Sequence, residues 1–337
     1  TKIDNGVLNI SARFSVGIWA LGPCAERFVP GGYRPEISIA ERFRMLSKVE
    51  DLKGVELHYP TEVPSVEEVE ELSRRYNLKV VALPVHLFNQ PKWKFGSLSA
   101  PDEKTRREAI ELTKETMDVA KRFDSLVIIW PGQDGFDYPF QVDYREHYKN
   151  FVEGLRECCE YRPEVKIALE YKLTEPRLRI LAGTIGMCLT IVNDVGCENL
   201  GINIDVGHAL LAYENMAHAI TLAAMKGKLF HVHLNDCFRR TDDDLIVGSV
   251  HFWETLELFY WLREVDYKGW YSLDLFPYRE DPVEAVRQSI ENIKFFMKLV
   301  DIIGKRKDEL REVFKSCNAV KGNRFLWSVL KEGLKEV

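Results

Sequence analysis

Disulfide frameworks and cysteine metal sites are missing from this sequence. Its seven cysteines include no CxxC pair and no regular spacing, and their number is odd. A small secreted domain stapled by disulfides normally has an even number of cysteines at characteristic intervals. We therefore expect reduced thiols and a cytoplasmic location.

The sequence also lacks a long apolar run, an N-terminal targeting pattern and an excess of positive charge. No run reaches the roughly 18 apolar residues that a membrane span needs. The formal net charge is −6, whereas proteins that bind nucleic acids usually carry a basic face. A small molecule is therefore a better partner for this chain than a membrane or a nucleic acid.

Short β-branched or apolar runs alternate with amphipathic, charged segments along most of the chain. This alternation is typical of parallel strands joined by helices, and eight such units can close into a (β/α)8 TIM barrel. An open, doubly wound sheet is the alternative, but no glycine-rich dinucleotide or phosphate loop follows the first strand. The expected strands are residues 14–19, 54–58, 79–84, 125–130, 166–170, 200–205, 229–234 and 270–275, and the clearest expected helices are 101–122, 144–161, 213–226, 252–265 and 282–300.

No linker or low-complexity tract divides the chain, so residues 1–300 are expected to form one barrel domain. Residues 301–337 continue as a lysine-rich amphipathic helical extension that includes Phe314 and Trp327. Its apolar face needs a partner. Either it folds back on its own barrel, or it is an arm that holds together a homo-oligomer such as a dimer or tetramer.

Four predicted strand ends in the second half carry groups that bind divalent metals: Glu170, Asp205, His233 and Asp274. The carboxyl ends of barrel strands converge on one face, so these groups are expected to form one site. A lone group of this kind would usually be a structural rim residue, but four consecutive strand ends favour a metal site.

A second ion is predicted beside the first, with Asp205 shared between the two. Its other expected ligands are His208, three residues after Asp205, and two carboxylates of the loop after the seventh strand, Asp242 and Asp244. An isolated run of three aspartates is usually a solvated turn, but its position beside His233 reverses that preference. Sites rich in carboxylates suit Mn²⁺, Mg²⁺ or Co²⁺ better than a structural Zn²⁺.

The order of several motifs resembles the xylose isomerase superfamily over about 300 residues. The segment from Glu170 to Arg177 is similar to the family's Glu-x-Lys-x-x-Glu-Pro segment, and Asp242-Asp-Asp244-Leu resembles its Asp-x-Asp-Leu metal segment. Four stretches in the first half resemble successive strand-end motifs of xylose isomerases: Phe14-Ser-Val-Gly-Ile-Trp19, Gly54-Val-Glu-Leu-His58, Leu87-Phe88 and Trp130-Pro-Gly-Gln-Asp-Gly135.

Two ligands depart from the xylose isomerase pattern. Asp205 stands where those enzymes have glutamate, and His233 stands where they have aspartate. L-rhamnose isomerases resemble this chain at both positions and in the run from Asp242 to Ser249, although the spacing from His233 is one residue longer here. The resemblance therefore points to the L-rhamnose isomerase branch without fixing the sugar.

The resemblance implies a metal-dependent aldose–ketose isomerase with two divalent ions, Mn²⁺, Co²⁺ or Mg²⁺, with Zn²⁺ able to replace them in crystals. Metal ions would stabilise the charge that develops on the sugar oxygens. Lys172, two residues after Glu170 on the same strand face, is placed to donate to the O1 oxygen. The expected catalytic residues are His58, Lys172 and Asp274, and the residues expected to contact the sugar are Trp19, Phe88, Trp130 and His208.

Three alternatives remain. A ketose 3-epimerase on the same barrel would use one metal with two glutamates; Asp274 opposes it, and Arg239 is the feature that favours it. A barrel-type apurinic endonuclease would need more histidine ligands and a basic surface. A non-catalytic sugar-binding barrel would have no use for two clusters of carboxylates.

Overall fold

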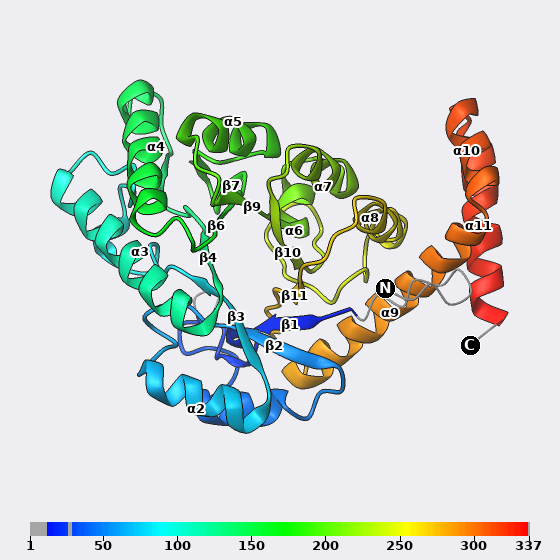
Figure 1. Ribbon diagram of the computed structural model, residues 1–337, viewed down its shortest axis with the longest axis horizontal. Helices are drawn as coiled ribbons and strands as arrows, with labels where there is room; N and C mark the ends of the chain where they lie inside the picture. The colour runs from blue at the N-terminus through cyan, green and yellow to red at the C-terminus, as the bar shows by residue number, and fades with distance from the viewer. Residues whose placement is uncertain (1–11, 26–28, 336–337) are drawn as a thin grey trace.

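The computed structural model describes residues 12–25 and 29–335, and it contains a closed barrel of eight parallel strands. Figure 1 shows helices surrounding this barrel. The barrel closes because β1 pairs with both β2 and β11, which confirms the TIM barrel and rules out the open sheet. Its strands are β1 (Phe14–Gly17), β2 (Leu52–Glu56), β3 (Lys79–Pro84), β4 (Leu126–Ile129), β6 (Ile167–Glu170), β9 (Leu200–Asp205), β10 (Leu229–Leu234) and β11 (Tyr271–Leu273).

All five helices expected from the sequence are present, and α4 has the predicted bounds. The helix α9 continues past residue 300 to Lys305. A small antiparallel sheet of β5 (Gly135–Phe136), β7 (Thr174–Glu175) and β8 (Leu178–Ile180) lies outside the barrel. The helices are α1 (Ile39–Leu46), α2 (Val66–Tyr76), α3 (Glu103–Phe123), α4 (Tyr144–Tyr161), α5 (Ile185–Val195), α6 (Val206–Leu211), α7 (Met216–Met225), α8 (Phe252–Glu264), α9 (Pro282–Lys305), α10 (Lys307–Ser316) and α11 (Ala319–Lys335), with 3₁₀ turns η1 (Ile18–Leu21) and η2 (Pro91–Trp93).

Most of these helices begin directly after a short polar side chain that accepts hydrogen bonds from the first turn. Such a cap satisfies backbone N–H groups that have no partner inside the helix, and it stabilises a helix by about 1 kcal/mol. The capping residues are Ser38, Ser65, Asp102, Asp143, Thr184, Asp205, Asn215 and Asp281. Asp205 is both the last residue of β9 and the cap of α6, so this connection has no separate loop.

The first strand ends earlier than the sequence pattern predicted. Residues 18–21 form the 3₁₀ turn η1, and the indole of Trp19 folds back over Gly17, where an added Cβ would lie 2.1 Å from the ring. Glycine is therefore required at position 17 by close approach. Trp19 lies beyond β1, and His58 lies beyond the end of β2 at Glu56.

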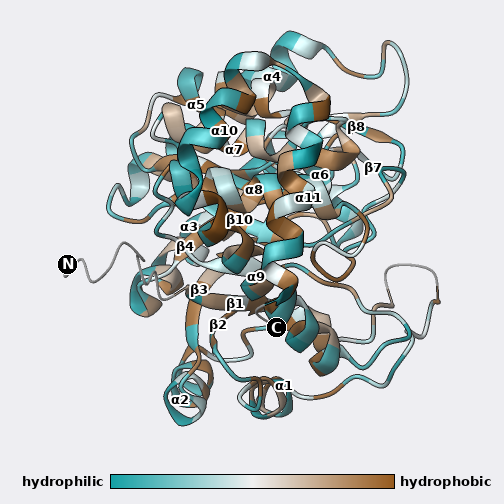
Figure 2. Ribbon diagram, turned by 90° about the vertical axis from the view of Figure 1, so that its right-hand side faces the viewer, coloured by the Kyte–Doolittle hydropathy of each residue, from teal (hydrophilic) through white to brown (hydrophobic). Residues whose placement is uncertain are grey.

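The C-terminal extension consists of α10 and α11, which project from the barrel at the end of α9 (Figure 1). Its helix α11 packs on α9 of the same chain, and the rings of Trp327 and Trp253 lie 5.4 Å apart. Figure 2, which views the molecule from that side, shows hydrophobic and hydrophilic segments alternating along these helices. Four apolar side chains of the extension stay exposed: Phe314, Val320, Trp327 and Leu334. Its role as an oligomerisation arm stays a prediction.

Within the described ranges, every helix is too short or too polar to traverse a lipid bilayer.

Candidate functional site

The four predicted strand-end groups lie together at the carboxyl end of the barrel. Each of Glu170, Asp205, His233 and Asp274 offers an atom that lies within 4.8 Å of the corresponding atoms of the others. The first three side chains are buried and Asp274 is half-buried. We call these four residues the first group; an imidazole and three carboxylates at this spacing can surround a divalent cation.

A second group consists of Asp205, His208 and Asp242, whose donor atoms also lie within 4.8 Å of one another. His208 Nε2 lies 3.2 Å from Asp242 Oδ2, and His208 Nδ1 lies 3.3 Å from Glu170 Oε1. The two groups are therefore adjacent and share Asp205. The shared residue, predicted from the sequence, emerges from the strand-to-helix connection between β9 and α6.

Local backbone geometry explains the Asp-Val-Gly-His sequence of this connection. Asp205 Oδ1 accepts a hydrogen bond from His208 N at 2.9 Å, which fixes the first turn of α6, the turn that carries His208. Gly207 N donates to Asn235 Oδ1 at 2.9 Å, and a Cβ at Gly207 would lie 2.7 Å from that oxygen. Only glycine allows β10 and α6 to approach this closely.

Asp244 lies beside the second group and is linked to Asp205 by two hydrogen bonds from the amide of Asn235. Asn235 Nδ2 donates to Asp205 Oδ2 at 2.9 Å and to Asp244 Oδ1 at 3.1 Å. The Asp244 carboxylate is buried, and it belongs to none of the ligand groups found among the described residues. The amide of Asn235 thus links both carboxylates, a contact that the sequence pattern did not predict.

Burial and crowding of like charges perturb the acid–base behaviour of the two groups. Burial, together with Asp242, Asp274 and Glu170, raises the pKa of Asp205 to about 7 despite the opposing influence of His208. Burial lowers the pKa of His208, but Asp205 and Asp242 outweigh it and raise that pKa to about 10. Carboxylates this close repel one another unless a positive charge lies between them.

Two buried ring nitrogens test whether a divalent cation fits here. His208 Nδ1 and His233 Nδ1 have no hydrogen-bond partner among the described residues, although His233 Nδ1 lies 3.4 Å from both Glu170 Oε2 and Asp274 Oδ2. A buried polar atom without a partner is costly, and an imidazole nitrogen surrounded by carboxylates is a typical metal ligand. The residues present therefore fit a divalent cation.

Lys172 lies next to the second group. Its Nζ donates to Asp242 Oδ2 at 2.8 Å and contacts the Glu175 carboxylate, and it lies 5.1 Å from the centre of the Trp130 ring. The side chain is almost completely buried. Lys172 lies two residues beyond the end of β6 at Glu170, and its ammonium reaches the second group through Asp242.

Aromatic side chains extend the site beyond the first group. The Trp19 ring lies 4.4 Å from that of His58, and the Phe88 ring lies 4.5 Å from that of Trp130 and 5.9 Å from that of His58. Trp19 Nε1 also donates to Asp274 Oδ1 at 2.7 Å. The four predicted aromatic and imidazole residues of the first half therefore form one wall that reaches the first group.

His58 is held in place by a carboxylate that the sequence analysis did not single out. Glu62 Oε2 lies 3.1 Å from His58 Nδ1 and accepts a hydrogen bond from His58 N at 2.8 Å. Arg42 in turn donates to Glu62 Oε1 at 2.9 Å. Burial raises the pKa of Glu62, but hydrogen bonds and charge from His58 outweigh it and lower that pKa overall. Glu62 and Arg42 therefore hold the His58 imidazole in its place in the wall.

The sequence did not lead us to predict two other residues near the site, Glu56 and His86. Glu56, at the end of β2, is completely buried against His231 and His233. His86 stacks on His58 at 4.9 Å and contacts Thr61 Oγ1 through Nδ1 at 2.6 Å. The signal for Glu56 was present, because residues 54, 56 and 58 share one strand face. His86 lies just beyond a strand, where alternation gives no direction.

Arg239, the feature that favoured an epimerase, contacts His251 and the helix α6. Its Nε donates to His251 Nε2 at 3.1 Å and one terminal nitrogen donates to the carbonyl of Leu210 at 3.4 Å. Asp236 accepts from the other nitrogen of His251 at 2.7 Å. These contacts fix the loop after β10.

The fold and site together define a class of protein: a closed parallel barrel with a buried cluster of carboxylates and imidazoles, suited to divalent cations, at the carboxyl ends of its strands. Within that class, the chain belongs to the family of the xylose isomerase-like TIM barrel, whose model matches residues 46–298.

The chain is 28% identical over 291 residues to a xylose isomerase of Thermus thermophilus, which covers 81% of this chain and 75% of that protein. A xylose isomerase of Thermus caldophilus is 27% identical over 292 residues, with the same shares covered. Among solved structures, an L-ribulose 3-epimerase has a TM-score of 0.67 at 16% identity and covers 89% of this chain and 97% of that one. A 3-keto-D-glucoside 4-epimerase of E. coli has a TM-score of 0.65 at 18% identity and covers 84% and 99%.

Proposed function

We propose that this protein is a metal-dependent aldose–ketose isomerase that uses two divalent ions and acts on L-rhamnose or a related aldose. The observation that carries the proposal is the pair of adjacent ligand groups sharing Asp205, with Lys172 in contact with the second group through Asp242. An enzyme with a single ion would need only the first group.

The proposed reaction moves a hydrogen between C1 and C2 of an open-chain sugar. Divalent ions, when bound, would supply Lewis-acid polarisation of the sugar oxygens. The first group would hold one ion, and Asp205, His208 and Asp242, with Asp244 close by, would hold the other. The Lys172 ammonium would donate a hydrogen bond to the O1 oxygen and stabilise negative charge there, as fixed donors do in other sites.

The other residues would prepare the sugar and exclude water. His58, oriented by Glu62, would exchange a proton with the ring oxygen during ring opening. Trp19, Phe88 and Trp130 would cover the reacting carbons with apolar surface. Asp274 would contribute to the first ion site while its Oδ1 accepts the hydrogen bond from Trp19.

The preference for L-rhamnose rests on two ligands. Asp205 and His233 occupy positions at which the L-rhamnose isomerases differ from the xylose isomerases in the same way. Aldoses of this group differ by hydroxyl configuration and one methyl, and a methyl group changes binding by about 1–3 kcal/mol. A panel of sugars is therefore needed to rank substrates.

A ketose 3-epimerase is the second candidate, because the first group alone is a complete set of ligands for one ion. The contacts of Arg239 with His251 and Leu210 count against it, since they direct this guanidinium away from the first group.

We also propose a homo-oligomer in the cytoplasm as the working form.

The test is ketose formation from L-rhamnose, L-mannose, D-xylose, L-lyxose and D-allose by protein stripped with EDTA and reloaded with Mn²⁺, Co²⁺ or Mg²⁺. We expect activity that needs an added ion and that is lost in Lys172→Met and Asp242→Asn. The matched control is Arg240→Met, which removes an exposed cation from the neighbouring loop. If the aldoses do not react, and protein that holds one ion epimerises D-fructose or D-tagatose at C3, the protein is a ketose 3-epimerase and not an aldose–ketose isomerase.

A further inference from the structure

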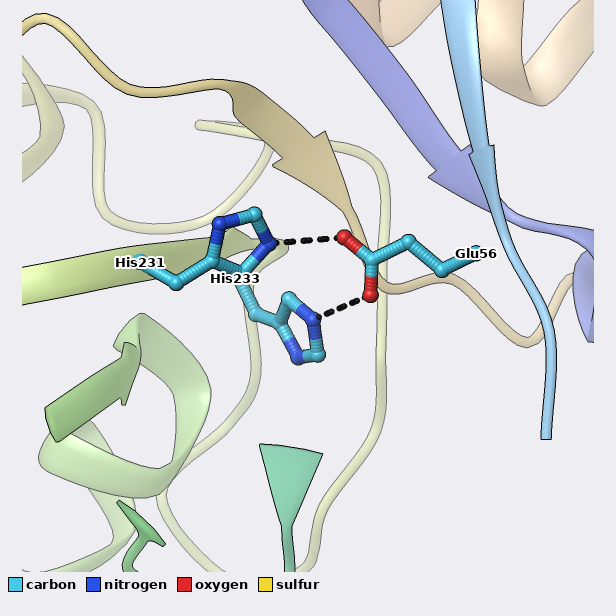
Figure 3. A group of neighbouring side chains, drawn as sticks. All are labelled: Glu56, His231 and His233. Carbon is cyan, nitrogen blue, oxygen red and sulfur yellow. Dashed lines mark hydrogen bonds and ion pairs between the residues drawn. The ribbon is translucent and has the colours of Figure 1, made fainter. Parts of the chain in front are cut away.

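A carboxylate with no solvent exposure connects the two sides of the barrel beneath the first group. Glu56 on β2 reaches across to His231 and His233 on β10, with Glu56 Oε1 2.7 Å from His231 Nε2 and Oε2 2.9 Å from His233 Nε2. Figure 3 shows the carboxylate facing both rings. Ser272 Oγ also donates to Oε1. Both carboxylate oxygens therefore have donors.

The two nitrogens of His233 have different surroundings. Nε2 faces Glu56, whereas Nδ1 faces the first group, at 3.4 Å from Glu170 Oε2 and Asp274 Oδ2 and 4.0 Å from Asp205 Oδ2. A carboxylate can only accept hydrogen bonds, so the nitrogen bonded to Glu56 must carry the hydrogen. In a neutral imidazole, the lone pair is then on the other nitrogen.

We propose that Glu56 is a positioning residue that holds His233 as the tautomer with hydrogen on Nε2, so that the Nδ1 lone pair points into the first group. The inference rests on the proposed metal-dependent function, because it assigns His233 to an ion. His231 and Ser272 fix the other carboxylate oxygen and thereby the plane of the carboxylate. A histidine ligand is commonly oriented by such a carboxylate behind it.

A competing role for the same three residues is a further ion site, because their donor atoms lie within 4.8 Å of one another. The contacts oppose it. Ser272 donates to the oxygen that also accepts from His231, and both His–Glu distances, 2.7 and 2.9 Å, are those of ordinary hydrogen bonds. An ion taking His233 Nε2 would also leave the hydrogen on Nδ1, facing the first group.

The first experiment measures metal affinity and stoichiometry for Glu56→Gln. Chelator competition with Mn²⁺ and Zn²⁺ should show about 10–100-fold weaker binding of one ion, and the visible absorption of the Co²⁺-loaded protein should change. Glu214→Gln is the matched control, since Glu214 is a partly buried carboxylate bonded to Tyr171 and Ile185 N; its affinity should equal that of the wild type.

The second experiment needs no variant that perturbs the core. The chain has eight histidines, so selective ¹⁵N-histidine labelling of the Zn²⁺-loaded protein gives a spectrum simple enough to read the tautomer, with His233→Asn used for assignment. We expect one ring with zinc on Nδ1 and hydrogen on Nε2. Zinc on Nε2 of His233 would overturn the inference even if Glu56→Gln failed to fold.

The outcomes separate this inference from the proposed function. If the wild type converts sugar but Glu56→Gln binds ions as tightly as the wild type, the positioning role fails and the isomerase stands. Three ions in the wild type and two in Glu56→Gln would make Glu56 a ligand and overturn the inference. If the protein binds ions without converting sugar, the proposed isomerase function is wrong. The ion affinities of the wild type and Glu56→Gln then decide by themselves whether Glu56 positions His233. A wild type that binds no divalent ion would overturn both.

Discussion

Lys172 Nζ lies 2.8 Å from Asp242 Oδ2 and 5.1 Å from the centre of the Trp130 ring. An ammonium group between a carboxylate and an aromatic face is held in one place, and it is directed at the second ligand group. Substitution by methionine should preserve the packing on Trp130 and remove the donor. We predict a loss of about 10²–10³ in kcat for Lys172→Met, the usual effect of removing one donor to a developing oxyanion, measured by ketose formation. A similar loss in the Arg240→Met control would refute this role.

The sharing of Asp205 predicts different ion stoichiometries in two variants. Asp205→Asn alters both ligand groups, so it should lower the affinity for both ions, whereas Asp242→Asn alters only the second group and should retain one tight ion. Elemental analysis after gel filtration, combined with calorimetric titration of Mn²⁺, measures this. Loss of one ion from each variant would contradict a shared ligand.

Gly207 is predicted to be intolerant of even one added methyl group. In Gly207→Ala the new Cβ would lie 2.7 Å from Asn235 Oδ1 and 3.2 Å from Asp205 Oδ1, which displaces both partners. Overpacking of this kind costs about 1–3 kcal/mol of unfolding free energy, and Mn²⁺ affinity should fall with it. The control is Gly186→Ala on α5, where the nearest atom is 3.9 Å away; that change should leave affinity unaltered. Equal behaviour of the two variants in urea unfolding would count against this packing argument.

His86 should make the protein less stable in acid. Burial, aided by His58 and opposed by Glu62, lowers the pKa of His86 from 6.5 to about 3. Below pH 6.5 the unfolded chain therefore binds a proton that the folded chain does not, so this contribution is fully present above 6.5 and is lost as pH falls toward 3.

Between pH 7.5 and pH 5 this loss should amount to about 1–2 kcal/mol, at a limit of about 1.4 kcal/mol per pH unit. His86→Asn should show a correspondingly smaller fall in unfolding free energy than the wild type, measured by urea titration at both values. Exposed His218 on α7, changed to Asn, serves as the control. Parallel losses in wild type and His86→Asn would refute the assignment.

The exposed apolar side chains of α11 should stabilise an oligomer. Val320 and Leu334 are 59% and 58% exposed, so changing both to glutamate has little effect inside one chain but places charges in any contact between chains. Light scattering should give a dimer or tetramer for the wild type and a lower mass for the double variant. Phe95→Glu, at a site 61% exposed outside the extension, is the control. An unchanged mass would rule out an oligomerisation arm at this surface.

Much of the architecture was predictable because its signals are local. The alternation of apolar runs and amphipathic segments gave all eight barrel strands, and polar groups at strand ends identified the members of the first group. The sequence also predicted that Lys172 belongs to the same site, and its ammonium contacts the second group through Asp242. These inferences need only the neighbouring residues and the convergence of parallel strands.

The remainder depends on contacts that no local pattern encodes. Whether a strand ends at Gly17 or Trp19 depends on the indole folding back. The partners of Glu56 lie 175 and 177 residues away on β10. The sequence around Glu56 therefore shows only a residue of a buried strand and does not indicate its partners. The direction of Arg239 depends on His251, and the position of Asp244 depends on the amide of Asn235. Side-chain identity alone fixes none of these.

The hydrogen bond from Trp19 to Asp274 joins residues separated by 255 positions, and these residues follow the first and last strands of the barrel. A nascent chain, or a fragment ending before β11, contains most of the metal-binding side chains but cannot bring this pair together. Ion binding at the first group should therefore appear only after the circle of strands has closed, which makes metal affinity a kinetic marker for the final event of folding.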